Sequence, residues 1–142
     1  EGVDLPFAQE TFYHDWLMAL SLKHGFAVEE LNYIFLDDEA LYAMNLEHLG
    51  HDDYTDILTF DLRAEPKQPL QGDIFISLDR VRENADTYAC PFEEELRRVM
   101  AHGLLHLVGF ADKTEEEVQA MRNAEAEALI LWEHVPRGTS ET

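Results

Sequence analysis

Two histidines four positions apart, His102 and His106, are the side chains whose types and spacing best suit catalysis. On a helix this spacing puts both imidazoles on one face, about one turn apart, where they can bind one metal ion. A catalytic zinc ion needs a third protein ligand and an open position for water. Gly109 lets the chain turn back after such a helix, and Asp112 lies six residues beyond His106, just past that turn. The pattern indicates a metal-dependent hydrolase.

The glycine between the two histidines, Gly103, bears on which chemistry they perform. A histidine pair at this spacing also arises by chance, with one ring in the core or capping it and the other solvated. Since glycine inside a helix costs about 1 kcal/mol relative to alanine, we expect Gly103 to have a packing or access reason. Peptidases with an H-E-x-x-H motif carry a glutamate general base at this position. The sequence therefore lacks the base that a peptidase of this type requires.

Three short segments carry motifs that occur in a fixed order. Residues 102–110 are HGLLHLVGF, residues 54–60 are YTDILTF with Asn45 nine positions before them, and residues 72–77 are GDIFIS. These segments resemble the patterns H-G-x-L-H-L-x-G-Y-D-H, N-x(8)-P-T-D-V-L-S-F and G-D-I-x-I-S of the YbeY family, bacterial metal-dependent endoribonucleases that mature ribosomal RNA. Glu125 matches the end of the M-x-x-x-E that follows the family signature.

The resemblance implies one zinc ion held at the three metal positions of the signature. Two of these are His102 and His106, and the third family histidine falls on Asp112, with Ala111 at the preceding family aspartate. A carboxylate binds zinc at a distance similar to imidazole, so the set is chemically sound, although the less positive ion makes its bound water less acidic. The alternative role for Asp112 is a solvated cap of the next helix. The replacement ligands are then His51, Asp52 and Asp53.

The resemblance implies that His102 and His106 are the catalytic residues, acting through water on their metal. It leaves open the roles of the remaining site residues. Asp56 and Asp73 are candidates for orienting a ligand histidine, with a purely structural role as the alternative. An arginine that the family often places near the phosphate falls on Leu49. The candidates to supply that positive or hydrogen-bonding group are His51, Arg80 and Arg82, the two arginines being solvated helix charges in the alternative interpretation.

The elements that must position these residues follow from hydrophobic periodicity and from helix-end signals. Helices are predicted over residues 10–24 and 38–48, from Asp79, from Pro91 to Gly109, and from Thr114, whose capping box is completed by Glu117. Strands are predicted over residues 31–36, 57–62 and 73–78, with an exposed loop at 63–71. The predicted fold is a single α+β domain over residues 1–142. It has a small mixed β-sheet of three to four strands, about five helices and a zincin-like metal-site helix.

Composition narrows the cellular setting. The single cysteine, Cys90, excludes a disulfide framework and fits a reducing compartment. No apolar run approaches the roughly 20 residues that span a bilayer, and no signal peptide opens the chain. We therefore expect a cytoplasmic protein without a membrane partner.

The net charge of −20, from 30 acidic and 10 basic residues, conflicts with binding RNA, since phosphate contacts need lysine or arginine. A locally basic cleft or a ribosomal partner would each resolve this conflict. The candidates for a basic cleft are Arg63, Arg80, Arg82, Arg97 and Arg98. The charge itself suggests adaptation to a salty cytoplasm, and the alternative is an acidic protein with no such adaptation.

With the resemblance, these features predict a zinc-dependent, single-strand-specific endoribonuclease in ribosomal RNA maturation or quality control. Its partners are expected to be ribosomal RNA or the small ribosomal subunit, and not DNA. The first alternative is another metal-dependent hydrolase, acting on a small ester or amide. The second is a metal-stabilised, ribosome-associated binding module without catalytic activity.

Overall fold

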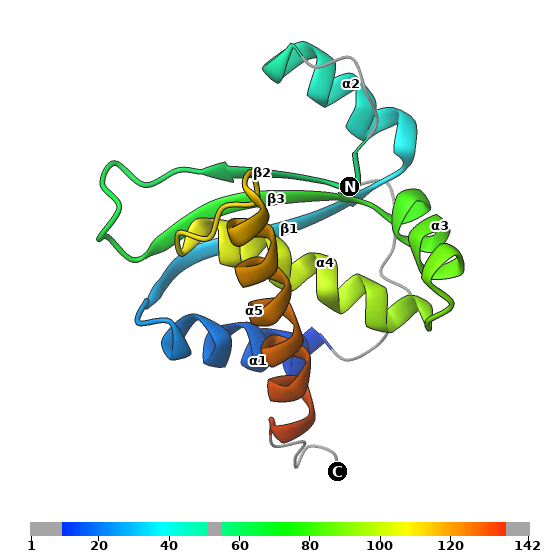
Figure 1. Cartoon of the computed structure of the whole chain (residues 1–142). Coiled ribbons are helices and arrows are strands. Elements are labelled where there is room, and N and C mark those ends of the chain that lie inside the picture. Colours follow the sequence, from blue (N-terminus) through cyan, green and yellow to red (C-terminus); the bar gives the residue numbers. More distant parts are fainter. Residues whose placement is uncertain (1–9, 51–54, 136–142) are drawn as a thin grey trace.

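The computed structural model describes residues 10–50 and 55–135, which form five helices and a three-stranded sheet (Figure 1). The helices are α1 (Glu10–Lys23), α2 (Asp38–Leu49), α3 (Leu78–Tyr88), α4 (Phe92–Leu107) and α5 (Glu115–His134). The strands are β1 (Val28–Leu36), β2 (Ile57–Asp61) and β3 (Leu70–Ser77). The predicted α+β class, with a small mixed sheet and about five helices, is confirmed.

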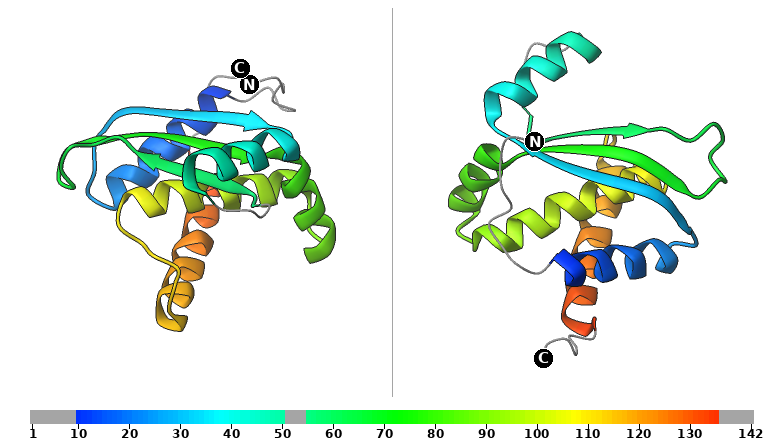
Figure 2. Two further views of the ribbon diagram at one scale, coloured as in Figure 1. Left: turned by 90° about the horizontal axis from the view of Figure 1, so that it is seen from above. Right: turned by 180° about the vertical axis from the view of Figure 1, so that it is seen from behind.

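The sheet has the order β1-β3-β2, with β3 parallel to β1 and antiparallel to β2. Helices α1, α4 and α5 lie on one side of it and α2 on the other, as two opposite views show (Figures 1 and 2). Successive residues of a strand point to opposite faces, so β3 contributes Ile74 and Ile76 to one core and Phe75 to another. The sheet therefore has one buried face, on the side of α1, α4 and α5, and one partly buried face on the side of α2.

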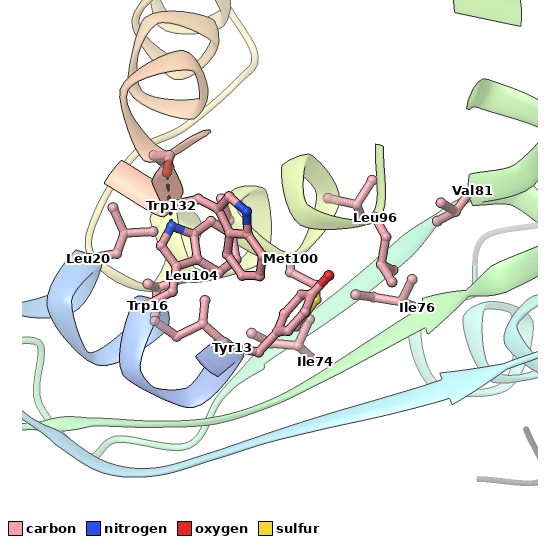
Figure 3. Packing of buried hydrophobic residues seen from close by; sticks show 14 of the residues in the cluster. Tyr13, Trp16, Leu20, Ile74, Ile76, Val81, Leu96, Met100, Leu104 and Trp132 are labelled. Atoms are coloured by element: carbon pink, nitrogen blue, oxygen red, sulfur yellow. Dashed lines mark hydrogen bonds between the residues drawn. The ribbon is translucent and has the colours of Figure 1, made fainter. Parts of the chain in front are cut away.

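The larger core lies between the sheet and helices α1, α4 and α5 (Figure 3). Two tryptophans, Trp16 and Trp132, meet edge to face with ring centroids 5.4 Å apart. The indole N–H of the fully buried Trp16 donates to the carbonyl of Ala128 at 2.9 Å. This contact fixes α1 against α5 and satisfies the polar group that burial would otherwise leave unpaired.

Helix α4 crosses the sheet and carries the histidine pair. Three glutamates occupy its first turn, near the positive end of the helix dipole. Gly103 faces the sheet, where an added Cβ would lie 2.9 Å from both Ile57 Cδ1 and Ile74 Cγ2. The predicted packing reason for this glycine is confirmed, because no side chain fits between the helix and strands β2 and β3.

Two strands begin earlier than their sequences predict. β1 begins at Val28, which pairs with Leu70, although Glu29 and Glu30 interrupt the apolar pattern. β1 is an edge strand, so these glutamates remain exposed while their backbone pairs with β3. β3 correspondingly begins at Leu70 and not at residue 73, and the predicted loop over 63–71 is two residues shorter at its C-terminal end. Helix α3 begins at Leu78, one residue before the predicted start.

Helix α5 begins with the predicted capping box. The Thr114 hydroxyl accepts from the backbone N–H of Glu117 at 3.0 Å, and the Glu117 carboxylate accepts from the backbone N–H of Thr114 at 3.1 Å. Since Thr114 caps this helix, Asp112 does not, and its side chain is available for another role. Over the described ranges, no helix is both long and apolar enough to cross a membrane.

Candidate metal centre

The two histidines of α4 present their rings to the same space. The centroids of His102 and His106 are 4.6 Å apart and the ring planes meet at 85°. The side chains are 18% and 30% exposed, so each ring is held by its surroundings yet accessible to a small ion. The one-turn spacing therefore produces the shared face that the sequence predicts.

The turn after α4 brings a carboxylate to these rings. Gly109 has a φ of 117°, and the backbone N–H of Phe110 donates to the carbonyl of Leu105 at 2.9 Å, which reverses the chain. Asp112 Oδ2 consequently lies 3.5 Å from the Nε2 of His102 and 3.4 Å from the Nε2 of His106. The three ligand atoms all lie within 4.8 Å of one another.

Two of these three spacings match those expected around a tetrahedral metal ion. Bonds of about 2.0–2.1 Å at tetrahedral angles put neighbouring ligand atoms about 3.3–3.4 Å apart. The two distances to Asp112 Oδ2, 3.4 and 3.5 Å, are close to that spacing. Two imidazole nitrogens and a carboxylate oxygen suit zinc, iron or nickel. The group is therefore a candidate site for a single ion.

The far nitrogen of each ring has its own hydrogen-bond acceptor. His102 Nδ1 lies 2.6 Å from Glu125 Oε2, and His106 Nδ1 lies 2.9 Å from the carbonyl oxygen of Phe110. A carboxylate and a carbonyl only accept, so each Nδ1 carries a hydrogen, and in the neutral ring the lone pair is then on Nε2. Both lone pairs are thereby available to a metal ion, in the arrangement common to protein metal sites.

Glu125 belongs to a buried polar network that extends behind the ligands. Arg98 donates two hydrogen bonds to Glu95, at 2.6 and 3.0 Å, and one to Glu125 at 3.0 Å. Burial raises the pKa of Glu125, but its hydrogen bond with His102 and the charge of Arg98 outweigh burial, so the pKa lies below its usual value. Glu125 is therefore a carboxylate that accepts from His102. The sequence signal for this role was the M-x-x-x-E match, without an indication of what its glutamate contacts.

An open pocket of about 570 Å³ adjoins the three ligands. One wall comes from β2 and the two residues before it, and the other from the ligands, Leu107 and Lys113. Asp56 lies in the first wall, where burial raises its pKa above the usual value despite the opposing charges of Arg98 and His102. A half-buried carboxylate in a wall of this pocket can accept a proton from a reacting group.

The other predicted site residues lie elsewhere. Asp73 accepts a hydrogen bond from the amide of Asn32 at 3.1 Å and does not line the pocket. Arg80 is paired with Asp38 at 2.6 Å, and Arg82 lies 5.0 Å from the centre of the Phe92 ring. The predicted candidates outside the described residues are His51, Asp52 and Asp53. Leu49 is the last residue of α2.

None of the five arginines predicted to form a basic cleft lines the pocket in the described part of the chain. Arg63 pairs with Asp61 at 2.7 Å, and Arg97 lies 4.4 Å from the Trp132 ring centre. The basic residue that does line the pocket is Lys113, which sequence reasoning missed even though it directly follows Asp112. Position along the chain gave no indication that its side chain reaches the same space as the ligands.

Known proteins are similar to this chain in sequence and in fold. The family model described as Endoribonuclease YbeY matches residues 4–133. Endoribonuclease YbeY of Cytophaga hutchinsonii is 46% identical over 131 residues, and that of Flavobacterium psychrophilum is 43% identical over 130 residues. Each alignment covers 92% of this chain and 91% of the relative. A Thermotoga maritima protein with a known solution structure superposes with a TM-score of 0.62 and 27% identity, over 95% of this chain and 93% of that protein. The chain belongs to the YbeY family.

Proposed function

We propose that the chain is a zinc-dependent endoribonuclease that cleaves single-stranded RNA during ribosomal RNA maturation or quality control. Its proposed partners are ribosomal RNA or the small ribosomal subunit, in the cytoplasm. The name Endoribonuclease YbeY, borne by relatives at 43–46% identity, supports the activity. The observation that carries the proposal is the convergence of His102, His106 and Asp112 at the wall of an open pocket.

Each residue has a defined part in this proposal. A zinc ion bound in the site would supply Lewis acidity and an activated water. His102, His106 and Asp112 would hold it, the two rings through Nε2 and the carboxylate through Oδ2. Glu125 fixes the ring of His102 by accepting from its Nδ1. Asp56 accepts the proton of the attacking water, a role for which a raised pKa is suited at neutral pH.

The number of protein ligands favours an enzyme over a metal-stabilised binding module. Structural zinc sites almost always have four protein ligands, whereas catalytic sites have three and keep one position for water. Three candidate ligands come together among the described residues, and they border a pocket. This arrangement leaves room for a water molecule and for a substrate phosphate beside it.

The test is cleavage of a single-stranded RNA by protein prepared without a histidine tag, after its metal content has been measured. We expect the wild-type protein to cut the strand internally, and chelation or His102→Ala to abolish cutting. A double-stranded RNA and a small carboxylic ester serve as comparison substrates. Equal activity of wild type and His102→Ala would point to a contaminating nuclease, and ester hydrolysis without RNA cleavage would favour the other hydrolase class.

A further inference from the structure

The pocket beside His102, His106 and Asp112 is called the metal pocket below. Nearly all basic side chains in the described part of the chain either contact an acidic or aromatic partner or do not line this pocket. Three arginines form ion pairs with N–O distances of 2.6–2.7 Å, namely Arg63, Arg80 and Arg98. Two more lie over aromatic rings, namely Arg82 and Arg97. Lys23 lies 3.9 Å from Glu127 on α5. Lys67 and Arg122 are exposed and do not line the metal pocket.

Lys113 differs from all of these. It is the basic residue in the wall of the metal pocket, and among the described residues its ammonium has no ion-pair partner. Its backbone N–H donates to the Glu117 carboxylate at 3.0 Å, within the capping box of α5. The backbone of Lys113 is therefore fixed beside the candidate ligand Asp112, while its side chain is exposed.

The pocket around Lys113 is otherwise acidic. Asp56, Asp61 and Asp112 all line it, with Asp61 paired to Arg63 at 2.7 Å, on a protein of net charge −20. A metal ion held by the candidate ligands would supply positive charge at one side of this space, and a second positive charge facing an anionic phosphodiester would strengthen its binding. A lysine ammonium is a compact charge with three donors on a flexible stem, which suits a phosphate oxygen whose position varies.

We propose that Lys113 binds the substrate phosphate, placing its ammonium against a non-bridging oxygen beside the metal centre. The role extends the proposed endoribonuclease function, since it names the residue that recognises the anionic group of that substrate. The ammonium of Lys113 also adds positive charge at the pocket, where a strongly acidic protein would have to accept RNA. Because Lys113 is exposed and outside the ligand set, replacing it leaves the fold and the metal ligands intact.

The first test measures binding of inorganic phosphate to the zinc-loaded protein by isothermal titration calorimetry. Lys113→Met is expected to weaken binding about tenfold or more, as for loss of one charge-assisted hydrogen bond. Lys113→Arg should restore affinity to within a few-fold. Lys67→Met is the matched control, because it removes the same charge from an exposed loop outside the pocket, and it should bind as the wild type does. Zinc content and thermal unfolding are recorded for every variant.

The second test measures kcat/KM for single-stranded RNA over a range of salt concentrations. Lys113→Met should lower kcat/KM. The slope of log(kcat/KM) against log[salt] should also be shallower than that of the wild type by about 0.7, the value for one lost phosphate contact on a single strand. Lys67→Met should keep the wild-type slope.

The two tests separate the two proposals. Equal phosphate affinity in wild type and Lys113→Met would overturn the role of Lys113, whatever the RNA assay gives. Phosphate binding that depends on Lys113, in a zinc-loaded protein that cleaves no RNA, would overturn the endoribonuclease function and leave the phosphate site in place. An equal fall in phosphate affinity or in kcat/KM for Lys67→Met and Lys113→Met would also contradict a specific role of Lys113, since it would reflect the loss of net charge alone.

Discussion

The orientation of the His102 ring depends on a contact of its Nδ1, on the side opposite the candidate metal site. The Glu125 carboxylate is buried, accepts from Nδ1 at 2.6 Å and is itself bound by Arg98 at 3.0 Å. A carboxylate in this position orients the imidazole and makes Nε2 a better electron-pair donor. The affinity for metal is therefore expected to depend on Glu125, a residue that does not touch the ion.

Glu125→Gln tests this dependence. The substitution keeps the shape of the side chain but removes the charge, so we expect zinc affinity to fall about 10–100-fold. Competition with a chelator of known affinity measures the change. Glu127→Gln is the matched control on the same helix, because Glu127 is exposed, lies 3.9 Å from Lys23 and does not line the pocket. Equal zinc affinity in wild type and Glu125→Gln would show that this contact does not support the site.

Asp56 links activity to stability through its pKa. Because the folded-state pKa lies above the unfolded value near 3.8, the folded apoprotein binds more protons, and its stability falls as pH rises through that range. Asp56→Asn removes the free-energy cost of keeping this carboxylate ionised in the folded protein at neutral pH. We expect the variant to be more stable than wild type at neutral pH, with the gain disappearing well below pH 3.8.

Denaturant unfolding in the presence of EDTA, at neutral and acidic pH, measures the stability difference. The same variant should cleave RNA roughly 100-fold more slowly, the usual effect of losing a general base. A stability gain that persists unchanged at acidic pH would contradict the pKa argument. Full activity would contradict the role of Asp56 as proton acceptor.

At the scale of elements, the distance between α4 and the sheet positions the ligands. Gly103 lies between the two histidines, against Ile57 of β2 and Ile74 of β3. Strand β2 supplies one wall of the pocket and α4 supplies two ligands, so their separation sets the width of the site. Any side chain at position 103 would push these two walls apart.

Gly103→Ala is therefore expected to destabilise the protein by about 1–3 kcal/mol, because overpacking outweighs the gain of about 1 kcal/mol in helix propensity. Thermal and urea unfolding measure the change. Combining it with Ile57→Val, which removes the Cδ1 atom that the new methyl would meet, should cost less than the two single substitutions added together. Strict additivity, or a more stable single variant, would contradict a packing role for this glycine.

Helices α4 and α5 could be predicted closely because their end signals and periodicity lie in the local sequence. Thr114 and Glu117 mark the start of α5 whatever surrounds them. The start of β1 could not be predicted, because exposed Glu29 and Glu30 resemble a loop until β3 pairs with them. The contact of His102 with Glu125 spans 23 residues, and it exists only because α5 packs against α4.

For the same reason, the sequence predicts the three residues that the structure brings together as a possible metal site, but not their surroundings. His102 and His106 follow from helical spacing, and Asp112 from the family signature. The place of Lys113 in the pocket depends on the exact path of the turn after Gly109. The contacts of Arg80 and Arg97 depend on partners that tertiary structure brings together, Asp38 and the Trp132 ring.

At the scale of the whole molecule, the charge of −20 opposes compactness. Acidic residues are spread along the chain, so folding concentrates like charges on one surface. Added salt screens this repulsion, since the Debye length is about 10 Å at 0.1 M and about 3 Å at 1 M. We expect the Tm to rise steadily from low salt to molar KCl, as adaptation to a salty cytoplasm predicts. An unchanged or falling Tm would count against that adaptation.

The central claim is that His102, His106 and Asp112 together hold one metal ion. The most direct measurement is the number of zinc ions bound per chain in tag-free protein, determined by elemental analysis after zinc loading and removal of excess metal. We predict about one zinc per chain for the wild type and none for the His102→Ala/His106→Ala double variant, with Asp112→Ala binding much more weakly. A wild-type protein that retains no metal, or a double variant that retains as much as the wild type, would contradict the claim.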